Sequence, residues 1–223
     1  MKTLVKTKQR VKDHGEVFTP DFIVNDMLNL VKHETERIES RFLEPACGDG
    51  NFLVPVLQRK LDVVLKKYGK SQVDFEKMSL FAVSSIYGID LLPDNVELCR
   101  DRLFKIFNEV YTKKYKSKSK DELRKSIHFI LNRNILQGNA LTLKTKNDTE
   151  LIVFSEWSLV NGGMVKRRDF QFADMAEFFE KDKMQSLFRV EEVSDSGEII
   201  FSPMPVKEYP LMHYLKFDYE DAK

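Results

Sequence analysis

The sequence has few residues that can cross-link it or hold a metal ion. Only two cysteines, Cys47 and Cys99, occur among its 223 residues, and its four histidines are scattered without the spacing of metal ligands. A small fold stapled by disulfides needs more cysteines, and a structural zinc site needs a cluster of closely spaced Cys or His ligands. We therefore expect neither a disulfide framework nor a metal site.

Long apolar runs and an excess of one charge are also absent. No stretch approaches the roughly 18 consecutive apolar residues of a membrane-spanning helix, and the N-terminal sequence MKTLVKTKQRVK has no apolar signal core. These absences predict a cytoplasmic protein without a membrane segment. Lys and Arg number 36 against 35 for Asp and Glu, so any surface that binds nucleic acid must be local. The lysine-rich run 113–125 is interrupted by acids and favours a solvated helix end or loop over such a surface.

What the sequence does contain is an alternation of strand-like and helix-like segments. Its 42% hydrophobic content is enough for one main domain with a small appendage. Short apolar runs are typical of strands, and the segments between them carry apolar residues at helical spacing. The predicted fold class is therefore α/β, with a parallel sheet flanked by helices. The expected helices cover 22–38, 52–68, 71–83 and 93–115. The first expected strand ends at Leu43, and three more cover 85–90, 134–141 and 150–157.

The ends of the first three expected strands carry residues suited to a nucleoside cofactor. Ligands of parallel α/β sheets bind beyond the carboxyl ends of the strands, where this sequence places LEPACGDGNFL (residues 43–53), Asp90 and Asn139. Gly48 and Gly50 permit a tight turn and a close backbone approach, and the following helix offers unpaired N–H groups. An acid such as Asp90 accepts hydrogen bonds from ribose hydroxyls, and the Asn139 amide suits the edge of an adenine ring. Each feature alone is as often a turn or a helix cap, but their order on successive strands favours a cofactor site.

Four ordered motifs resemble those of adenine-specific DNA methyltransferases, a family that includes the modification subunits of type I and fused type II restriction systems. GEVFTP (15–20) resembles the N-terminal motif and LEPACGDGNFL the glycine motif, while YGIDLLPDNVELCRDRL (87–103) resembles the ribose motif and NILQGNAL (134–141) the motif that usually ends Gly-Asp-Ala-Leu. The resemblance covers residues 10–142 and implies a Rossmann-like fold, S-adenosylmethionine as cofactor and DNA as partner. In the family, the N-terminal threonine approaches the methionine end of the cofactor, and the positions of Leu91 and Leu92 flank its adenine. The implied cofactor residues are Phe18, Thr19, Pro20, Glu44, Pro45, Ala46, Cys47, Gly48, Gly50, Phe52, Asp90, Leu91, Asn139 and Ala140.

The chain also departs from the family pattern. Asp49 stands where a small hydroxyl residue is commoner, and Asn139 replaces an aspartate, which weakens acceptance of a hydrogen bond from the adenine amine. The family's catalytic motif is Asn, Asp or Ser followed by Pro-Pro and an aromatic residue, which orients the target amine and stacks on a base flipped from the duplex. No Pro-Pro occurs in this sequence. At the expected place, Ser155 and Trp157 offer a polar group and an aromatic ring without the prolines.

Two hypotheses about function follow, and we expect a second protein subunit that carries the catalytic and target-recognition functions. In the first, the chain is an S-adenosylmethionine-dependent DNA adenine (N6) methyltransferase of a restriction-modification system, either divergent or unable to methylate alone because the catalytic motif lies on another chain. In the second, it is a catalytically silent subunit that binds the cofactor, or keeps only the fold, and assembles with or regulates a partner. The catalytic residues are unknown under both. A small-molecule or protein amine as substrate is disfavoured, because the Phe-Thr-Pro motif belongs to the DNA group.

The last third of the sequence is unlike the family. Extended runs on both sides of residues 161–163 predict a hairpin, and 173–188 predicts an amphipathic helix. The basic run 166–168 beside Phe170 and Phe172 suits either a phosphate-binding patch or a solvated edge strand.

The expected domain organisation has three parts. They are a basic arm over 1–14, a methyltransferase-like domain over 15–158, and a C-terminal extension over 159–223. The extension is shorter than the roughly 100 residues of most independent domains, so we expect no target-recognition domain in this chain. Its final segment is rich in apolar residues and packs either on the domain or on a partner, with packing on the domain favoured.

Overall fold

A computed structural model of the chain describes residues 10, 12, 19–146, 149–174, 189–193 and 199–217. The site residue Phe18 lies outside these residues, and so does the helix expected over 173–188 except for its first two positions. Within the described ranges, no helix combines the length and the apolar character that a membrane crossing requires.

The parallel sheet predicted from the sequence is present and is small. Strands β1 (Phe42–Glu44), β2 (Ile86–Asp90) and β3 (Ile135–Asn139) pair in parallel in that order, and the short β4 (Lys144–Thr145) adds to β3 in the antiparallel sense. The run of apolar residues in β2 is fully buried up to Asp90, as expected for a strand covered on both faces. All three strands lie where the sequence placed them.

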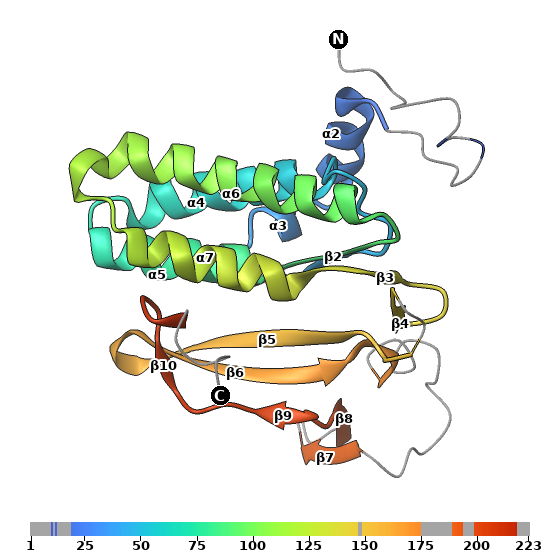
Figure 1. Cartoon of the computed structure of the whole chain (residues 1–223). Coiled ribbons are helices and arrows are strands. Elements are labelled where there is room, and N and C mark those ends of the chain that lie inside the picture. The colour runs from blue at the N-terminus through green and yellow to red at the C-terminus, as the bar shows by residue number, and fades with distance from the viewer. Residues whose placement is uncertain are drawn as a thin grey trace.

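Four long helices connect the parallel strands. They form two layers, α4 with α6 and α5 with α7, stacked along most of their length (Figure 1). Each buries an apolar stripe at the spacing of a helical face, such as Leu53, Val56, Leu57 and Leu61 on α4. Their bounds are α4 Leu53–Tyr68, α5 Gln72–Ser84, α6 Pro93–Tyr115 and α7 Asp121–Asn134, with a single 3-10 turn η1 (Lys116–Lys118) before α7.

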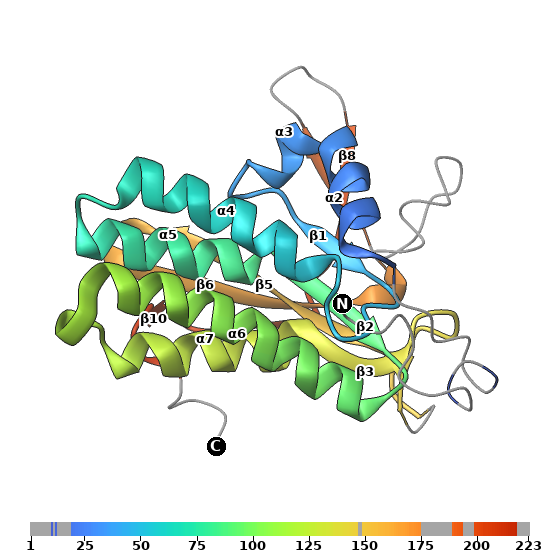
Figure 2. The same cartoon turned by 90° about the horizontal axis from the view of Figure 1, so that it is seen from above.

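The helix expected over 22–38 is broken into two pieces. Helix α2 (Asp21–Leu30) starts directly after Pro20, and α3 (Lys32–Thr35) follows a non-helical Val31 with φ −115° and ψ 32°. Only Val24 and Leu28 of α2 are buried. Seen from above, α2 and α3 lie beside β1, at one side of the helical layers (Figure 2).

The strand expected over 150–157 does not continue the parallel sheet. It is the first arm of the predicted hairpin, in which β5 (Val153–Val160) pairs with β6 (Met164–Gln171) around the turn η2 (Asn161–Gly163). The position 158/159, where the sequence suggested a domain boundary, lies inside β5. Strands β9 (Lys207–Glu208) and β10 (Met212–His213) add to β6, and β7 (Arg189–Val193) pairs with β8 (Ile199–Pro203).

The antiparallel sheet packs against the parallel strands and the helices above it. Tyr87 of β2 donates a hydrogen bond of 3.0 Å to the Ser155 carbonyl oxygen of β5, and its ring meets Phe154 edge-on at 5.3 Å. Trp157 Nε1 donates to Asn134 Oδ1 at 3.1 Å, at the end of α7. The hairpin thus forms a third layer below α5 and α7 (Figure 1).

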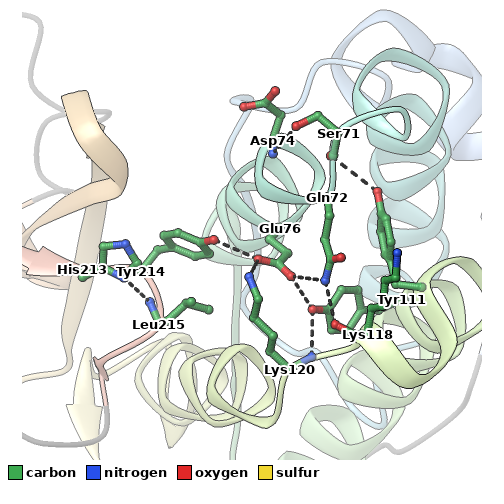
Figure 3. A network of polar contacts seen from close by, with 11 residues as sticks. Ser71, Gln72, Asp74, Glu76, Tyr111, Lys118, Lys120, His213, Tyr214 and Leu215 are labelled. Atoms are coloured by element: carbon green, nitrogen blue, oxygen red, sulfur yellow. Dashed lines mark hydrogen bonds and ion pairs between the residues drawn. The ribbon is translucent and has the colours of Figure 1, made fainter.

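A buried carboxylate ties the C-terminal segment to the helices. Glu76 on α5 has no exposed surface and accepts hydrogen bonds from Tyr111 at 2.5 Å, Lys120 at 2.7 Å, and Gln72 and Tyr214 at 2.8 Å each (Figure 3). Burial and the hydrogen bond to Glu76 raise the pKa of Tyr111 to about 12, so this hydroxyl remains a donor.

Apolar residues of the same segment also enter the core. Met212, Tyr214 and Phe217 are at most 5% exposed, and the Phe217 ring stacks on Trp157 at 5.3 Å. Met204 and Leu211, which the sequence also marked as apolar, stay about half exposed at 49% and 48%. Residues 207–217 therefore pack back on the body of the molecule.

Candidate functional site

A pocket of about 550 Å³ opens at the carboxyl ends of the three parallel strands. This is the edge where parallel α/β sheets bind ligands, and the volume is in the usual range for small-molecule sites. Its lining comes from the loop after β1, the turn between β2 and α6, and the end of β3. The lining residues are Thr19, Glu44, Pro45, Ala46, Cys47, Gly48, Asn51, Phe52, Asp90, Leu91, Leu92, Asn95, Gly138, Asn139, Ala140 and Leu141.

The glycine loop between β1 and α4 is shaped by two left-handed residues. Gly48 has φ 53° and Gly50 has φ 88°, values that side chains strongly disfavour. A Cβ on Gly50 would also lie 2.9 Å from Cys99 Sγ of α6. The loop is pinned by Cys47, whose N–H donates to the Ile89 carbonyl at 2.9 Å and whose carbonyl accepts from Gly50 at 2.8 Å. Gly50 therefore shapes the pocket from below without lining it.

Asp90 connects the glycine loop to the second strand. Its Oδ2 accepts from the Gly48 N–H at 2.9 Å, and its Oδ1 accepts from the Leu92 N–H at 2.8 Å and from Asn95 Nδ2 at 3.2 Å. Two backbone amides thus orient a half-buried carboxylate at the pocket wall. An ionised carboxylate offers about four acceptor positions, which leaves capacity for a ligand hydroxyl.

Asn139 at the end of β3 is partly engaged by its own turn. Its Oδ1 accepts from the backbone N–H of Leu141 at 2.9 Å and of Thr142 at 3.4 Å. Of the donor and the acceptor that the sequence offered for an adenine edge, the acceptor is engaged by the turn and the Nδ2 donor is left for a ligand. A donor matches a ring nitrogen of adenine better than its exocyclic amine.

The N-terminal motif reaches the pocket through Thr19. Asn51 Nδ2 donates to the Thr19 carbonyl at 3.4 Å, which joins the start of α2 to the glycine loop. Pro20 does not line the pocket and instead precedes α2, where its ring suits the entry to a helix. Arg10 contacts the start of α6, with Nη1 2.7 Å from Asp94 Oδ2 and Nη2 3.3 Å from Asn95 Oδ1.

Glu44 is the second carboxylate of the pocket. It ends β1 and is half-buried. Burial raises the pKa of Glu44 from its ordinary value near 4.5, and a hydrogen bond from the Ala46 backbone N–H only partly opposes this. A positively charged ligand group beside it would favour the ionised form.

Asp49, which stands where the family more often has a small hydroxyl residue, forms an ion pair with Arg102. Its side chain is buried and its Oδ1 lies 2.8 Å from Arg102 Nη1 of α6. The same guanidinium donates to the Asp49 carbonyl at 2.7 Å and to Asn51 Oδ1 at 3.3 Å. Arg102 therefore binds the glycine loop at two positions, Asp49 and Asn51.

Removing Arg102 is expected to destabilise the protein through Asp49. Arg102→Met should lower the free energy of unfolding by about 2 kcal/mol, because a buried carboxylate loses its ion-pair partner. Adding Asp49→Ser should recover part of that loss, giving a coupling of about 1 kcal/mol in a double-mutant cycle. Urea unfolding of the four proteins measures both quantities, with Lys105→Met on the exposed face of α6 as control. Additive effects would show that the pair does not hold the loop.

Cys47 of the loop and Cys99 of α6, which packs against the loop, are both buried free thiols. A side-chain hydrogen bond with Cys99 and burial raise the pKa of Cys47 far above its usual range. The nucleophilic thiolate is therefore disfavoured, although Cys47 lines the pocket. Among the residues that the structure describes, no group of three or more His, Cys, Asp or Glu side chains is placed to hold a metal ion.

The structure brings together most of the residues that the sequence selected. Eleven of them line the pocket, whereas Pro20 and Gly50 support it from outside and Phe18 lies beyond the described residues. Asn51, Asn95, Gly138 and Leu141 line it without having been assigned a role from the sequence. A signal existed for the first two, because Asn51 lies in the glycine motif and Asn95 lies in the ribose motif, shortly after Asp90.

Ser155 and Trp157 do not replace the catalytic motif. Both are 3% exposed and neither lines the pocket. Ser155 Oγ bonds to Asp169 at 2.6 Å and to Arg167 at 3.0 Å, and the Trp157 ring packs in the core. Neither residue is therefore placed to orient a target amine at the pocket.

The basic run of β6 is neither a phosphate-binding patch nor an edge strand. Strand β6 is interior to its sheet, between β5 and β10. Arg167 is 2% exposed and pairs with Asp169 at 2.8 Å, while Lys166 and Arg168 form ion pairs with Glu208 and Glu156. Phe170 and Phe172 are each 9% exposed, so neither ring is presented to bases in solution.

Comparison with known proteins gives one family. The sequence profile described as N-6 DNA Methylase matches residues 3–129, which is more than half of the 223-residue chain. The match includes the glycine loop and Asp90 and ends before Asn139. No curated protein and no solved structure shows significant similarity to the chain.

Proposed function

The chain belongs to the N-6 DNA methylase family, and from this premise we propose that its pocket binds S-adenosylmethionine for a DNA adenine N6-methyltransferase of the restriction-modification type. Members of the family generally use this cofactor and act on DNA. Bound at this edge, it would supply an electrophilic methyl group on a sulfonium ion. We infer a cytoplasmic location, where such an enzyme meets its DNA.

The single observation that carries the proposal is the arrangement around Asp90. A carboxylate held by the N–H groups of Gly48 and Leu92 at the end of the second strand suits the two hydroxyls of a ribose. The neighbouring Leu91 side chain is 55% exposed and offers an apolar surface to an adenine ring. Asn139 supplies a donor at the third strand, and Glu44 supplies negative charge at the first. Together these groups match the ribose, the base and the cationic end of the cofactor.

The chain is proposed to need a second subunit for methyl transfer. An adenine amine reacts only if it is held in line with the methyl group, and the family does this with a rigid Pro-Pro motif. The sequence has no such motif, and Ser155 and Trp157 are engaged in the core. We therefore assign cofactor binding to this chain and orientation of the target base to a partner.

The same absence leaves an alternative in which the chain is a silent assembly or regulatory subunit. The two proposals differ in one measurable respect. A methyltransferase half transfers labelled methyl groups from S-adenosylmethionine to adenine-rich DNA when mixed with a companion that carries the Pro-Pro motif, and this transfer depends on Asp90 of the present chain. A silent subunit leaves the companion's rate unchanged when Asp90 is replaced.

Cofactor binding is tested by calorimetry with the isolated chain, and Glu44 provides a sharper form of the test. The pKa of Glu44 is raised by burial, so its carboxylate protonates at a higher pH than an ordinary glutamate. Affinity for the cationic cofactor should therefore be higher at neutral pH than in acid, and should decline as pH falls through this raised pKa. Glu44→Gln should bind about tenfold more weakly at neutral pH, equivalent to about 1.4 kcal/mol, and should lose the pH dependence.

The demethylated product S-adenosylhomocysteine serves as the ligand control, because it lacks the sulfonium charge. A pH effect confined to S-adenosylmethionine locates Glu44 near the sulfur, and an effect on both ligands locates it near the amino group. No binding of either ligand by the wild-type chain would end the cofactor proposal.

A further inference from the structure

Helix α2 exposes an unusual amount of apolar surface for its length. Four of its apolar residues and its C-terminal neighbour face away from the core, and Leu30 is 82% and Phe22 68% exposed. Exposed apolar groups scattered singly are normal, but a group of them on one short helix marks an interaction surface. The exposed apolar residues of this surface are Phe22, Ile23, Met27, Leu30 and Val31.

Strand β1, which lies beside α2 and α3 (Figure 2), has an open edge. Among the described strands it pairs only with β2. The Phe42 N–H donates to the Ser85 carbonyl at 2.9 Å, so the peptide groups of Phe42 and Glu44 face β2. By the alternation of a strand, the N–H and carbonyl of Leu43 point the other way, outward from the sheet. The Leu43 side chain is also 43% exposed.

A buried lysine of α4 connects the segment before β1 to the core. Lys60 of α4 is fully buried, and its ammonium donates to the carbonyls of Ile38 at 3.1 Å and of Ser40, and to Ser85 Oγ at 2.5 Å. The segment that enters β1 is thereby fixed to the core although one side of the strand is unpaired. A groove of about 540 Å³ runs beside it, lined by Val31, Glu34, Arg37, Glu39, Ser40, Arg41 and Phe42.

The open edge is continuous with the pocket. Glu44 is both the last residue of β1 and the first of the loop residues that line the pocket. A further strand laid along β1 in the parallel sense would end at the same sheet edge, beside Glu44 and Pro45. Residues following that strand would stand at the pocket mouth.

We propose that the open edge of β1 and the apolar face of α2 bind a second protein chain, which adds a parallel strand to β1 and carries the residues that orient the target amine to the pocket. This inference rests on the proposed function, since it names the place of the missing subunit. A second copy of this chain does not suit the surface. Symmetric pairing of β1 with β1 is antiparallel, which turns the second pocket to the opposite end, and a copy brings no Pro-Pro motif.

The test uses the protein encoded next to this chain that carries the Asn-Pro-Pro-aromatic sequence. Light scattering after size-exclusion chromatography should show a one-to-one complex with the wild-type chain. Leu43→Pro removes only an outward N–H, which an edge strand tolerates, and Leu30→Glu places a charge on the apolar face. Each should weaken the complex at least tenfold, while Val73→Glu, on α5 with 49% exposure of the native residue, should leave it within twofold.

Affinity for S-adenosylmethionine separates this inference from the proposed function. Leu30→Glu should bind the cofactor as the wild type does while failing to bind the companion, which also shows that the variant is folded. The inference is overturned if the companion binds all variants equally, if it does not bind the wild type, or if the face instead pairs two copies of this chain. Complex formation without cofactor binding would overturn the proposed function alone.

Discussion

Asp90→Ala is expected to abolish cofactor binding at any practical concentration. The substitution removes the acceptors for a ribose and also leaves the Gly48 and Leu92 N–H groups without the carboxylate that orients them. Hydrogen bonds to charged groups are worth about 1.5 to 3 kcal/mol each, so losing two or more should weaken S-adenosylmethionine binding by at least a hundredfold. Isothermal calorimetry measures the change directly.

Two further variants test whether the loss of S-adenosylmethionine binding comes from the Asp90 carboxylate. Asp90→Asn keeps one acceptor oxygen and should bind between the wild type and the alanine variant. Glu97→Ala removes an exposed acid of α6 that does not line the pocket and should bind as the wild type does. Binding by Asp90→Ala within twofold of the wild type would show that the ribose contact is elsewhere.

Glu76→Ala is expected to be the most destabilising single change outside the pocket. It leaves donors from Lys120, Tyr111 and Tyr214 facing a space without an acceptor. Breaking a buried, charged network from one side costs about 3 to 5 kcal/mol. For a chain of this size the melting temperature should fall by roughly 10 °C. Thermal unfolding followed by circular dichroism tests this, and Glu109→Ala on the exposed face of α6 should shift it by less than about 1 °C.

The Glu76 carboxylate also determines how the stability of the protein changes with pH. Burial by itself raises the pKa of Glu76, but the hydrogen bonds from Lys120, Tyr111, Gln72 and Tyr214 outweigh it and lower this pKa below its ordinary value of 4.5. A carboxyl whose pKa is lowered by folding contributes stability above the unfolded pKa and loses it as pH falls through the folded one. The stability difference between wild type and Glu76→Ala should therefore be full at neutral pH and shrink as the pH falls below 4.5, through the lowered pKa of Glu76. A difference that stays constant down to acid unfolding would exclude this ionised network.

The sequence predicts the pocket well because its residues lie in local patterns at strand ends. Asp90, Gly48 and Asn139 each follow a short apolar run, and a parallel sheet brings the ends of its strands to one edge. The family and the α/β class were predicted correctly for the same reason. What the patterns do not contain is how these groups bond to each other. The turn that occupies Asn139 Oδ1 depends on the backbone of Leu141 and Thr142 and changes which ligand group it suits.

The last third was harder to predict because its structure depends on contacts between distant residues. The alternation in 150–157 indicates a strand but not its sheet, and only packing on Tyr87 places β5 in a separate layer. Arg167 is buried because Asp169 pairs with its charge and Ser155 Oγ accepts a hydrogen bond from it, which three consecutive basic residues in a sequence cannot indicate. Helix α7 was not expected, since its first residues lie in the lysine-rich run, although Leu123, Ile127, Ile130 and Leu131 form a buried apolar stripe along it.

The bond between Tyr214 and Glu76 joins residues 138 positions apart in the chain. During synthesis the ribosome adds about 5 to 20 residues per second, and segments fold as they emerge. Helix α5 and the strands around the pocket are synthesised before Tyr214 and Phe217. The nascent protein therefore passes through a stage in which the Glu76 carboxylate lacks its hydrogen bond from Tyr214 and the Trp157 ring is not yet covered by Phe217. That stage exposes apolar surface, and chaperone demand should therefore concentrate on chains stalled between β6 and β10.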